Sequence, residues 1–338
     1  MNEDATAVHQ RLGLIDLHVD FVIQNRLFGY RPERRHGPGW RGQPLFNHCD
    51  LPRMADAAYG GACLGVHYFP WQSERGWRAA LRQMDYIDTL AARDDVLRVR
   101  EAGDWDLARA QQRIGIAVGV EGAHILNGRL ERVEELRRRD VMYLTLAHFS
   151  RNDAVSPSMG LGANRARGLT GFGRELVQTL NGAGIAIDVA HVSAAGVLEA
   201  CALSTAPVLC THTGARAVHD SPRNLDDEGI DAVVSTGGAI GVIFGPIFLS
   251  GRLRAPTTCV ADHVDYLVDR AGINHVAIGT DYDGWLPSIP NDQRDCRDLV
   301  VLTQELLRRG YTEGQLRRLY RENAVRVHGA VRAAGLLS

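Results

Sequence analysis

Short apolar runs, separated by polar or glycine-rich segments, recur along the whole chain. Stretches with apolar residues at helical spacing lie between most of them. A strand followed by a helix, repeated about eight times, is typical of a parallel (β/α)8 barrel. We therefore predict an α/β fold in which residues 1–338 form a single TIM-barrel domain. The predicted strands are Leu14–Leu17, Ala62–Tyr68, Ile114–Val120, Tyr143–Ala147, Ile185–Val189, Pro207–Thr211, Ala239–Phe244 and His275–Gly279.

Helical periodicity predicts seven helices between and after these strands. They are Arg75–Arg93, Phe172–Ala183, Ala194–Leu203, Leu225–Ser235, Val260–Ala271, Asp298–Arg309 and Glu313–Leu336. Two further segments, Gly29–Asn47 and Ser150–Gly171, are too rich in glycine and arginine for regular structure. Both follow predicted strands, on the side where barrels build their active sites. We expect them to be either plain surface loops or walls of a substrate cleft.

Composition excludes several classes of function. The formal net charge of the 338 residues is -2, which provides no broad field for nucleic acid or an anionic membrane. No apolar stretch approaches the roughly 20 residues that span a bilayer, and Met1–Leu12 lacks the apolar core of a signal peptide. We expect a cytoplasmic protein, and the use of arginine without any lysine suggests a bacterial, GC-rich genome.

Five side chains that commonly bind metal ions stand at the ends of four predicted strands. They are His18, Asp20, Glu121, His191 and His212. His18 and Asp20 are two residues apart, so on a strand both side chains face the same way and can share one ion. The carboxyl ends of barrel strands meet at one face, where we expect all five to gather. Mixed imidazole and carboxylate ligands suit Zn2+, with Mn2+, Co2+ or Fe2+ as alternatives.

The absence of lysine restricts how two metal ions could be bridged. Barrel hydrolases with two ions need an anionic group between them, and a carboxylated lysine often provides it. Here only a carboxylate or a cysteine could serve, and Glu121 is the obvious candidate. The six cysteines are scattered without a C-x-x-C pair, so we interpret them as small core residues.

Several longer motifs resemble the membrane (renal) dipeptidase family, peptidase family M19, a branch of the amidohydrolase superfamily of metal-dependent barrel hydrolases. The matching stretches run in the right order over nearly the whole chain: DLHVD (Asp16–Asp20), VGVEGAH (Val118–His124), MYLTLAH (Met142–His148), GLTGFGRELVQTLNGAGIAIDVAHVS (Gly168–Ser193), PVLCTHTGARAV (Pro207–Val218), SPRNLDDE (Ser221–Glu228) and HVAIGTDYDG (His275–Gly284).

This resemblance implies two Zn2+ ions per chain and assigns the ligands to them. His18, Asp20 and Glu121 would hold the first ion, while Glu121, His191 and His212 would hold the second. Glu121 would bridge the two, as the absence of lysine also indicates. Two such ions about 3.5–4 Å apart can generate a nucleophile near neutral pH and stabilise a developing oxyanion.

The resemblance also implies roles for three residues outside the ligand set. Asp281 would be the proton shuttle, taking a proton from water and delivering it to the leaving amine. His148 would polarise the scissile carbonyl group and stabilise the tetrahedral intermediate. Arg223 would grip the free C-terminal carboxylate of the substrate, which a guanidinium group can do with two hydrogen bonds. The substrates implied are small dipeptides, L,L and possibly L,D, and family members often form homodimers.

The chain departs from the family pattern near the substrate. A proline after the first H-x-D motif is replaced by Phe21 and Val22, and the stretches Gly65–Trp71 and Ile243–Gly245 also differ. His67 could reach the site or serve only as a structural histidine. The main alternative is therefore a related amidohydrolase acting on a non-dipeptide amide or lactone, such as a natural-product tailoring hydrolase. A non-catalytic barrel that serves as a binding partner is a third, weaker hypothesis.

Overall fold

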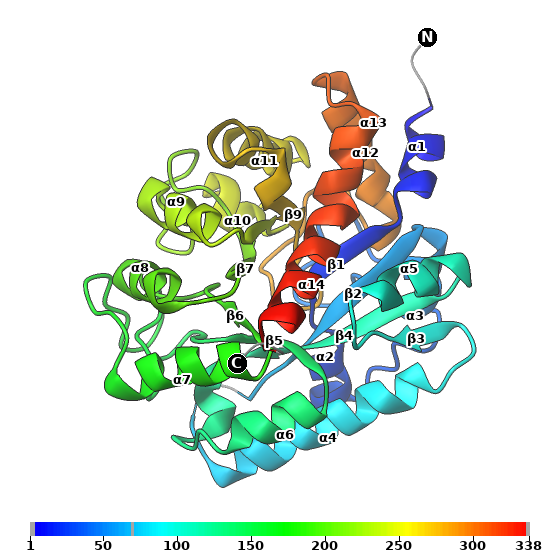
Figure 1. The fold of residues 1–338 in the computed structure, drawn as a ribbon. Helices are drawn as coiled ribbons and strands as arrows, with labels where there is room; N and C mark the ends of the chain where they lie inside the picture. Colours follow the sequence, from blue (N-terminus) through cyan, green and yellow to red (C-terminus); the bar gives the residue numbers. More distant parts are fainter. Residues whose placement is uncertain (1–3, 69–70, 336–338) are drawn as a thin grey trace.

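Parallel strands form a barrel at the centre of the molecule, with helices around it (Figure 1). The computed structural model describes residues 4–68 and 71–335. Eight strands are neighbours in the order β1-β2-β4-β5-β6-β7-β8-β9, and β3 pairs with β4 beside this path. The strands are β1 (Leu14–Val19), β2 (Tyr59–Val66), β3 (Val96–Arg98), β4 (Ile114–Glu121), β5 (Val141–Thr145), β6 (Ala186–Asp188), β7 (Leu209–Thr213), β8 (Ala239–Val242) and β9 (Val276–Ile278).

The first and last strands approach each other at their carboxyl ends, which nearly closes the barrel. Val19 forms a parallel bridge with Tyr282, just beyond β9. The backbone N–H of Asp20 donates to the carbonyl of Tyr282 at 2.8 Å, and that of Asp281 donates to the carbonyl of His18 at 3.0 Å. The two ends of the sheet therefore meet at the same place as the first predicted metal ligands.

Helices cover the outside of the barrel (Figure 1). The α-helices are α1 (Ala5–Leu12), α2 (Phe21–Phe28), α3 (Leu51–Asp56), α4 (Glu74–Ala91), α5 (Gly103–Ala110), α6 (Arg132–Arg138), α7 (Gly171–Gly182), α8 (Ala194–Leu203), α9 (Asp227–Ser235), α10 (Pro246–Ser250), α11 (Thr258–Ala271), α12 (Val300–Arg308), α13 (Glu313–Arg317) and α14 (Asn323–Gly335). The 3-10 helices are η1 (Ala123–Leu126), η2 (Ile273–His275) and η3 (Cys296–Leu299), and η4 (Arg318–Glu322) is a π-helix. None of the helices in residues 4–68 and 71–335 has the length and apolar character needed to cross a bilayer.

Two apolar layers stabilise this arrangement. The larger one lies between the strands and the surrounding helices, and the smaller one includes Leu17, Cys63, Ala117 and Tyr143. Every residue of the named strands is buried, as expected for parallel strands covered on both faces. All six cysteines are buried and free, in agreement with their interpretation as core residues.

The (β/α)8 fold is confirmed, and each of the eight predicted strands overlaps an observed one. β3 was not predicted, because three residues are too few to show a period. The helix predicted over Glu313–Leu336 is observed as three helical segments without a gap, α13, η4 and α14, of which the middle one is a π-helix. Its last residue lies outside the described residues. The wider π turn accommodates buried Tyr320 and Arg321, whose guanidinium group bonds to Asp106 at 2.6 Å.

Candidate metal centre

The five predicted ligands lie together at the carboxyl ends of the strands. The ligand atoms form two groups, and within each group they lie within 4.8 Å of one another. The groups are His18, Asp20 and Glu121, and Glu121, His191 and His212. Glu121 is common to both groups. Its Oε1 atom lies 3.0 Å from Nε2 of His191, 3.4 Å from Nε2 of His212 and 3.5 Å from Nε2 of His18. Three imidazole nitrogens thus face one carboxylate oxygen.

Hydrogen bonds on the far side of two imidazole rings fix which nitrogen faces the centre. The Tyr143 hydroxyl donates to the carbonyl of Leu17 at 3.1 Å, so it accepts from Nδ1–H of His18 at 2.7 Å. The Thr211 hydroxyl donates to Asp188 at 2.8 Å and accepts from Nδ1–H of His212, also at 2.8 Å. Both rings therefore turn Nε2 towards Glu121, and this is the nitrogen that would bind a metal ion.

The polar atoms at the centre lack partners of their own. Nε2 of His18, Oδ1 of Asp20 and Oε2 of Glu121 are buried without a hydrogen bond. Nε2 of His191 and Nε2 of His212 lie 2.9 Å apart. Lone pairs and carboxylate oxygens that converge in a buried space repel one another unless a cation lies between them. The donor set therefore fits divalent metal ions with oxygen and nitrogen preference.

Burial keeps the second group of imidazoles neutral. Burial, followed by the positive charge of Arg223, lowers the pKa of His191 to about 3. Burial also lowers the pKa of His212 well below its usual value, and His18 and Arg223 add to this effect. Although burial alone would raise the pKa of Glu121, the facing His148 and His18 hold it well below the ordinary value. His191 and His212 are thus neutral beside an ionised carboxylate, the forms in which these groups coordinate cations. Burial would lower the pKa of His18 as well, but Tyr143, Asp20 and Glu121 raise it well above its usual value.

Asp281 lies at the edge of this cluster, in the turn after β9. Its Oδ1 atom is 4.0 Å from Nε2 of His18, and its backbone has φ 61. Burial raises the pKa of Asp281 well above its usual value, and the neighbouring Asp20 and Glu121 raise it further while His18 opposes them. A carboxyl group with a raised pKa can both accept and donate a proton near neutral pH.

His148 and Arg223 approach the cluster from different elements. His148 follows β5, and its Nε2 atom lies 3.5 Å from Oε2 of Glu121. Arg223 is in the segment between β7 and α9, and it is only 3% exposed. Its Nη2 atom donates to the carbonyl of His212 at 2.7 Å and lies 3.2 Å from Nε2 of His191, while its Nε is buried without a partner. Every predicted site residue is thus found in this one region.

His67 also reaches the centre, which the sequence left open. Its Nδ1 atom lies 3.4 Å from Oε2 of Glu121, and its ring centroid is 5.1 Å from that of His148. Glu121 therefore has one oxygen facing the ligand histidines and the other facing His67 and His148. The only sequence signal was the position of His67 directly after β2. Of the other residues of that divergent stretch, Phe69 and Pro70 lie outside the described residues.

Two buried aspartates support the ligands, and the sequence analysis did not single them out. Asp16 accepts from the backbone N–H and the hydroxyl of Thr280 at 2.9 and 2.7 Å, which ties β1 to the turn that carries Asp281. Asp188 accepts from the hydroxyls of Thr145 and Thr211 at 2.5 and 2.8 Å, which joins β5, β6 and β7. Each precedes a ligand histidine by two or three residues, a spacing that could have revealed them.

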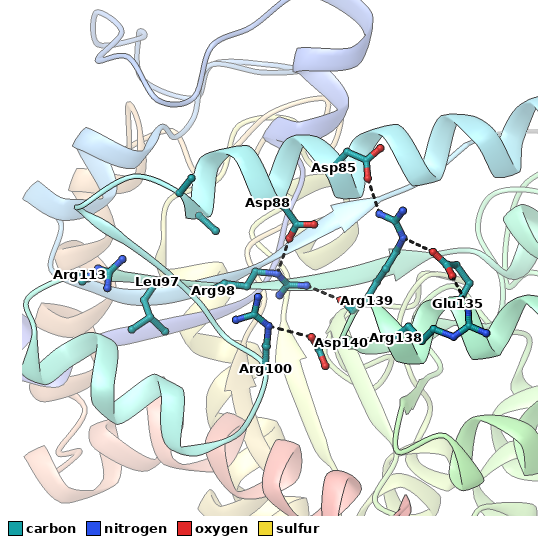
Figure 2. Close-up of a pocket in the computed structure, with 12 residues that line it drawn as sticks. Asp85, Asp88, Leu97, Arg98, Arg100, Arg113, Glu135, Arg138, Arg139 and Asp140 are labelled. Atoms are coloured by element: carbon teal, nitrogen blue, oxygen red, sulfur yellow. Dashed lines mark hydrogen bonds and ion pairs between the residues drawn. The ribbon is translucent and has the colours of Figure 1, made fainter.

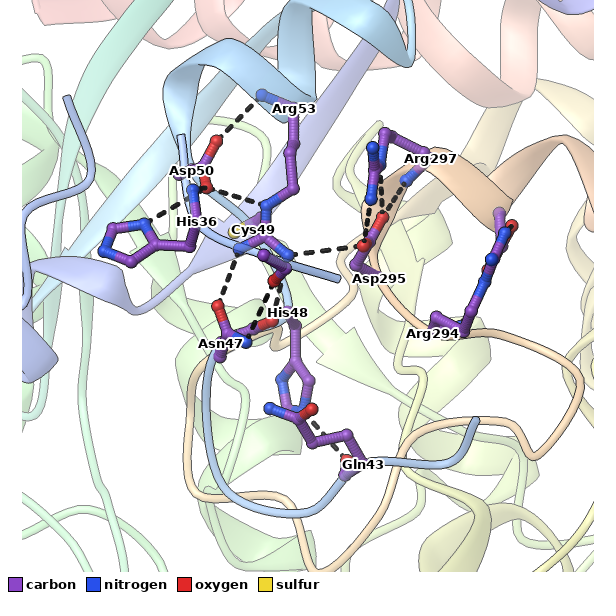
Figure 3. Close-up of polar contacts among 12 residues, drawn as sticks. His36, Gln43, Asn47, His48, Cys49, Asp50, Arg53, Arg294, Asp295 and Arg297 are labelled. Carbon is purple, nitrogen blue, oxygen red and sulfur yellow. Dashed lines mark hydrogen bonds and ion pairs between the residues drawn. The ribbon is translucent and has the colours of Figure 1, made fainter. Parts of the chain in front are cut away.

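A polar network joins residues 36–53 to residues 294–297 (Figure 3), and His48 also bonds to the turn after β9. The backbone N–H of His48 donates to Asp283 at 2.7 Å, and the N–H of Asp283 donates to Nδ1 of His48 at 3.0 Å. Arg53 is fully buried and bonds to Asp50 at 2.7 Å and to Asp295 at 3.3 Å. These contacts hold the segment around residue 48 against the turn, so the position of Asp281 depends on residues far from it in sequence.

A cavity of about 410 Å3 opens above the metal centre. Its wall is formed by Asp20, Arg26, Leu27, His67, Tyr68, Glu121, His148, Phe149, His191, Asp281, Gly284 and Trp285. None of these lies in segments 29–47 or 150–171, so in the described residues the two irregular loops do not line it. The first loop instead supports the wall, because backbone N–H of Trp285 donates to the carbonyl of Leu45 at 3.2 Å.

A larger hollow of about 760 Å3 lies elsewhere, between α4, β3 and α6 (Figure 2). β3 pairs with the first residues of β4, whereas Glu121 is the last residue of that strand. The hollow is therefore at the opposite end of the barrel from the metal centre. Its arginines bond to acids in the same wall: Arg98 to Asp88 at 3.3 Å and Arg139 to Asp85 at 2.7 Å. We do not interpret it as the reaction site.

Comparison with known proteins agrees with this geometry. The model of the membrane dipeptidase family (peptidase family M19) matches residues 2–336. Dipeptidase verJ of Clonostachys rogersoniana is 30% identical, over 94% of this chain and 84% of that relative. Dipeptidase 3 of Rattus norvegicus is 29% identical, over 97% and 67%. A Rhodobacter sphaeroides metallopeptidase, solved with a phosphinate mimic of L-Ala-D-Ala, is 25% identical with TM-score 0.83, covering 94% of this chain and 99% of that one.

Proposed function

Because this chain belongs to the membrane dipeptidase family, peptidase family M19, we propose that it is a binuclear zinc dipeptidase. It would hydrolyse the amide bond of small dipeptides that carry a free C-terminal carboxylate. The observation that supports two ions is the arrangement around Glu121, whose Oε1 faces Nε2 atoms of His18, His191 and His212 at 3.0–3.5 Å. A single carboxylate shared by two ligand groups is suited to bridging two cations.

His18, Asp20 and Glu121 would hold one ion, and Glu121, His191 and His212 would hold the other. Ions bound there supply Lewis-acid activation of water near neutral pH. Asp281 would accept a proton from the attacking water and return it to the leaving amine. Its position beside His18, 4.0 Å from Nε2, supports this assignment.

His148 and Arg223 would bind the substrate on the two sides of the scissile bond. His148 lines the cavity and would donate a hydrogen bond to the carbonyl oxygen as negative charge develops there. Arg223 has a buried Nε without a partner, and a carboxylate would complete its hydrogen bonding. The cavity of about 410 Å3 is of the size that suits a small-molecule ligand. The L-Ala-D-Ala mimic bound by the Rhodobacter relative supports L,D-dipeptides as substrates in addition to L,L-dipeptides.

The experiment that tests this function combines metal analysis with a dipeptide panel. Protein purified without chelator should contain about two zinc ions per chain and should hydrolyse dipeptides but not their C-terminal amides. In Arg223→Met the ratio of kcat/KM for the free acid to that for the amide should fall by about tenfold or more. A parent enzyme with fewer than two ions, or with equal rates on acids and amides, would contradict the proposal.

One observation favours a second candidate, an amidohydrolase acting on a non-dipeptide amide or lactone. The cavity wall contains His67, which the family pattern does not predict, and the exposed apolar side chains of Leu27 and Trp285. These residues suit a substrate with more apolar surface than a simple dipeptide. Lactone or cyclic amide turnover in the absence of any dipeptide turnover would favour this candidate.

A further inference from the structure

Arg26 is a cation in the wall of the substrate cavity that has no anionic partner. It lies on α2, which begins directly after the ligand Asp20. Its guanidinium carbon lies 5.4 Å from the ring centroid of Tyr68, which also lines the cavity. Its Nε atom is buried without a hydrogen bond, and within residues 4–68 and 71–335 no carboxylate lies within ion-pair distance of it.

The surroundings make this unpaired charge unfavourable. Burial lowers the pKa of Arg26, and the nearby Arg75 and Arg82 lower it further, whereas Tyr68 only partly opposes them. Other half-buried or buried arginines in the described chain bond either to acids or, like Arg113 and Arg332, to backbone carbonyls, whereas Arg26 has no such bond there. Arg53 contacts Asp50, for example, at 2.7 Å. Desolvated charge without a counter-ion costs free energy, so a cation left in this state at a cavity wall indicates that a ligand supplies the anion.

The acids in the same wall do not serve as that partner. They are Asp20, Glu121 and Asp281, and their close contacts are with histidines of the metal centre. Bound cations would compete for these carboxylates and leave Arg26 as unpaired as before. Arg26 is half-buried and therefore remains available to an anionic group of a molecule that enters the cavity.

Arg223 and Arg26 approach the centre from different parts of the barrel. Arg223 contacts His191 and His212, which follow β6 and lie in β7, whereas Arg26 lies beside the end of β1 and the segment after β2. Around the barrel, those two regions are separated by β4 and β5 on one side and by β8 and β9 on the other. A single carboxylate held by Arg223 would consequently leave Arg26 free for a second one.

We propose that Arg26 binds a second carboxylate of the substrate, so that this enzyme prefers dipeptides with an acidic side chain. The inference rests on the proposed dipeptidase function and specifies its substrate class. Arg26 is a specificity-determining residue, and the experiment below identifies which residue of the dipeptide carries the acidic side chain. Its guanidinium group would donate from Nε and one Nη to the two carboxylate oxygens.

Paired substrates that differ only in charge test the proposal. One pair is L-Glu-L-Ala with L-Gln-L-Ala, which places the acid on the N-terminal residue. The other is L-Ala-L-Glu with L-Ala-L-Gln, which places it on the C-terminal residue. Each is measured with the metal-loaded parent, with Arg26→Gln and with Arg78→Gln. Arg78 lies exposed on α4, does not line the cavity and undergoes the same change in charge.

The parent should favour the Glu member of one pair by about tenfold or more in kcat/KM. Arg26→Gln should abolish that preference and should change kcat/KM for the Gln-containing dipeptides by less than about twofold. Arg78→Gln should retain the preference of the parent. The proposal is overturned if the parent shows no preference in either pair, or if Arg26→Gln lowers kcat/KM equally for all four dipeptides. The affinities of phosphinate mimics of the same four dipeptides, measured by calorimetry, give the same comparison without turnover. If no dipeptide is hydrolysed, the dipeptidase function fails, and these binding ratios still decide the charge preference.

Discussion

The Nε2 atom of His191 lies 3.0 Å from Oε1 of Glu121, although the two residues come from opposite halves of the sequence. The same oxygen faces His18 and His212. This carboxylate therefore lies where two sets of ligands overlap, and removing its charge should affect both. The effects of a substitution at Glu121 on metal content and on activity can be measured separately from those of any other residue at the site.

Glu121→Gln should reduce the zinc content from about two ions per chain to about one or fewer, because a neutral amide cannot bridge two cations. We expect kcat/KM to fall more than about 100-fold. Metal analysis after gel filtration, together with dipeptide turnover, checks this result. A variant that retains both ions would show that Glu121 is not the bridge.

Gly65→Ala should weaken the first metal group without changing any ligand. A Cβ atom at position 65 would lie 1.9 Å from Oδ1 of Asp20, so the carboxylate would have to move. We expect zinc affinity to fall about 10–100-fold, the range seen when a ligand is misplaced. Gly37→Ala is the matched control, because a Cβ there has nothing within 4 Å. Equal zinc affinity in the two variants would contradict the expected displacement.

Asp281→Asn should lower kcat about 10²–10⁴-fold while both ions remain bound. The asparagine is nearly isosteric but cannot accept and return a proton. Its effect should appear in kcat more than in KM, and titration with zinc should give the parental stoichiometry. Loss of metal together with activity would instead indicate that Asp281 acts as a ligand, as its place beside His18 and His212 would permit.

His9, which is far from the metal centre, should make the stability of the protein depend on pH. It is buried, with Nδ1 2.7 Å from the Thr303 hydroxyl, and burial lowers its pKa from 6.5 to about 4. Between these values the unfolded chain binds more protons than the folded one, so the free energy of unfolding falls as the pH drops from about 6.5 to about 4.

The contribution of this one group over that window is about 3 kcal/mol. His9→Gln should remove it, so the stability difference between parent and variant should narrow as the pH falls. Urea unfolding at pH 7.5 and pH 4.5 measures the change. A difference that stays constant with pH would show that His9 does not remain neutral in the folded protein.

The strands and the gathering of the ligands could be predicted from the sequence for a simple reason. Parallel strands present their carboxyl ends to one face, so residues such as Glu121 and His212 must meet once the strands are recognised. What could not be predicted depends on contacts between distant segments. The short β3 and the π-helix η4 have no period of their own, and η4 is explained by the packing of Tyr320 and Arg321 against the barrel.

Side chains that act through tertiary contacts could not be predicted from the sequence for the same reason. His67 shows no motif, and only the structure reveals that it lies 3.4 Å from Glu121, at the end of the neighbouring strand β4. Asp16 and Asp188 resemble ordinary strand residues until Thr280 and Thr211 are seen to bond to them. Arg26 is one of many arginines in the sequence, and its lack of a partner is visible only in three dimensions.

The meeting of β1 with the turn after β9 has a consequence for biosynthesis. During translation the amino-terminal ligands emerge from the ribosome long before Tyr282 exists to accept the N–H of Asp20. A growing chain therefore lacks part of the centre, and a metal ion acquired early would meet only a partial ligand set. Stable incorporation of metal should follow synthesis of the nearly complete polypeptide.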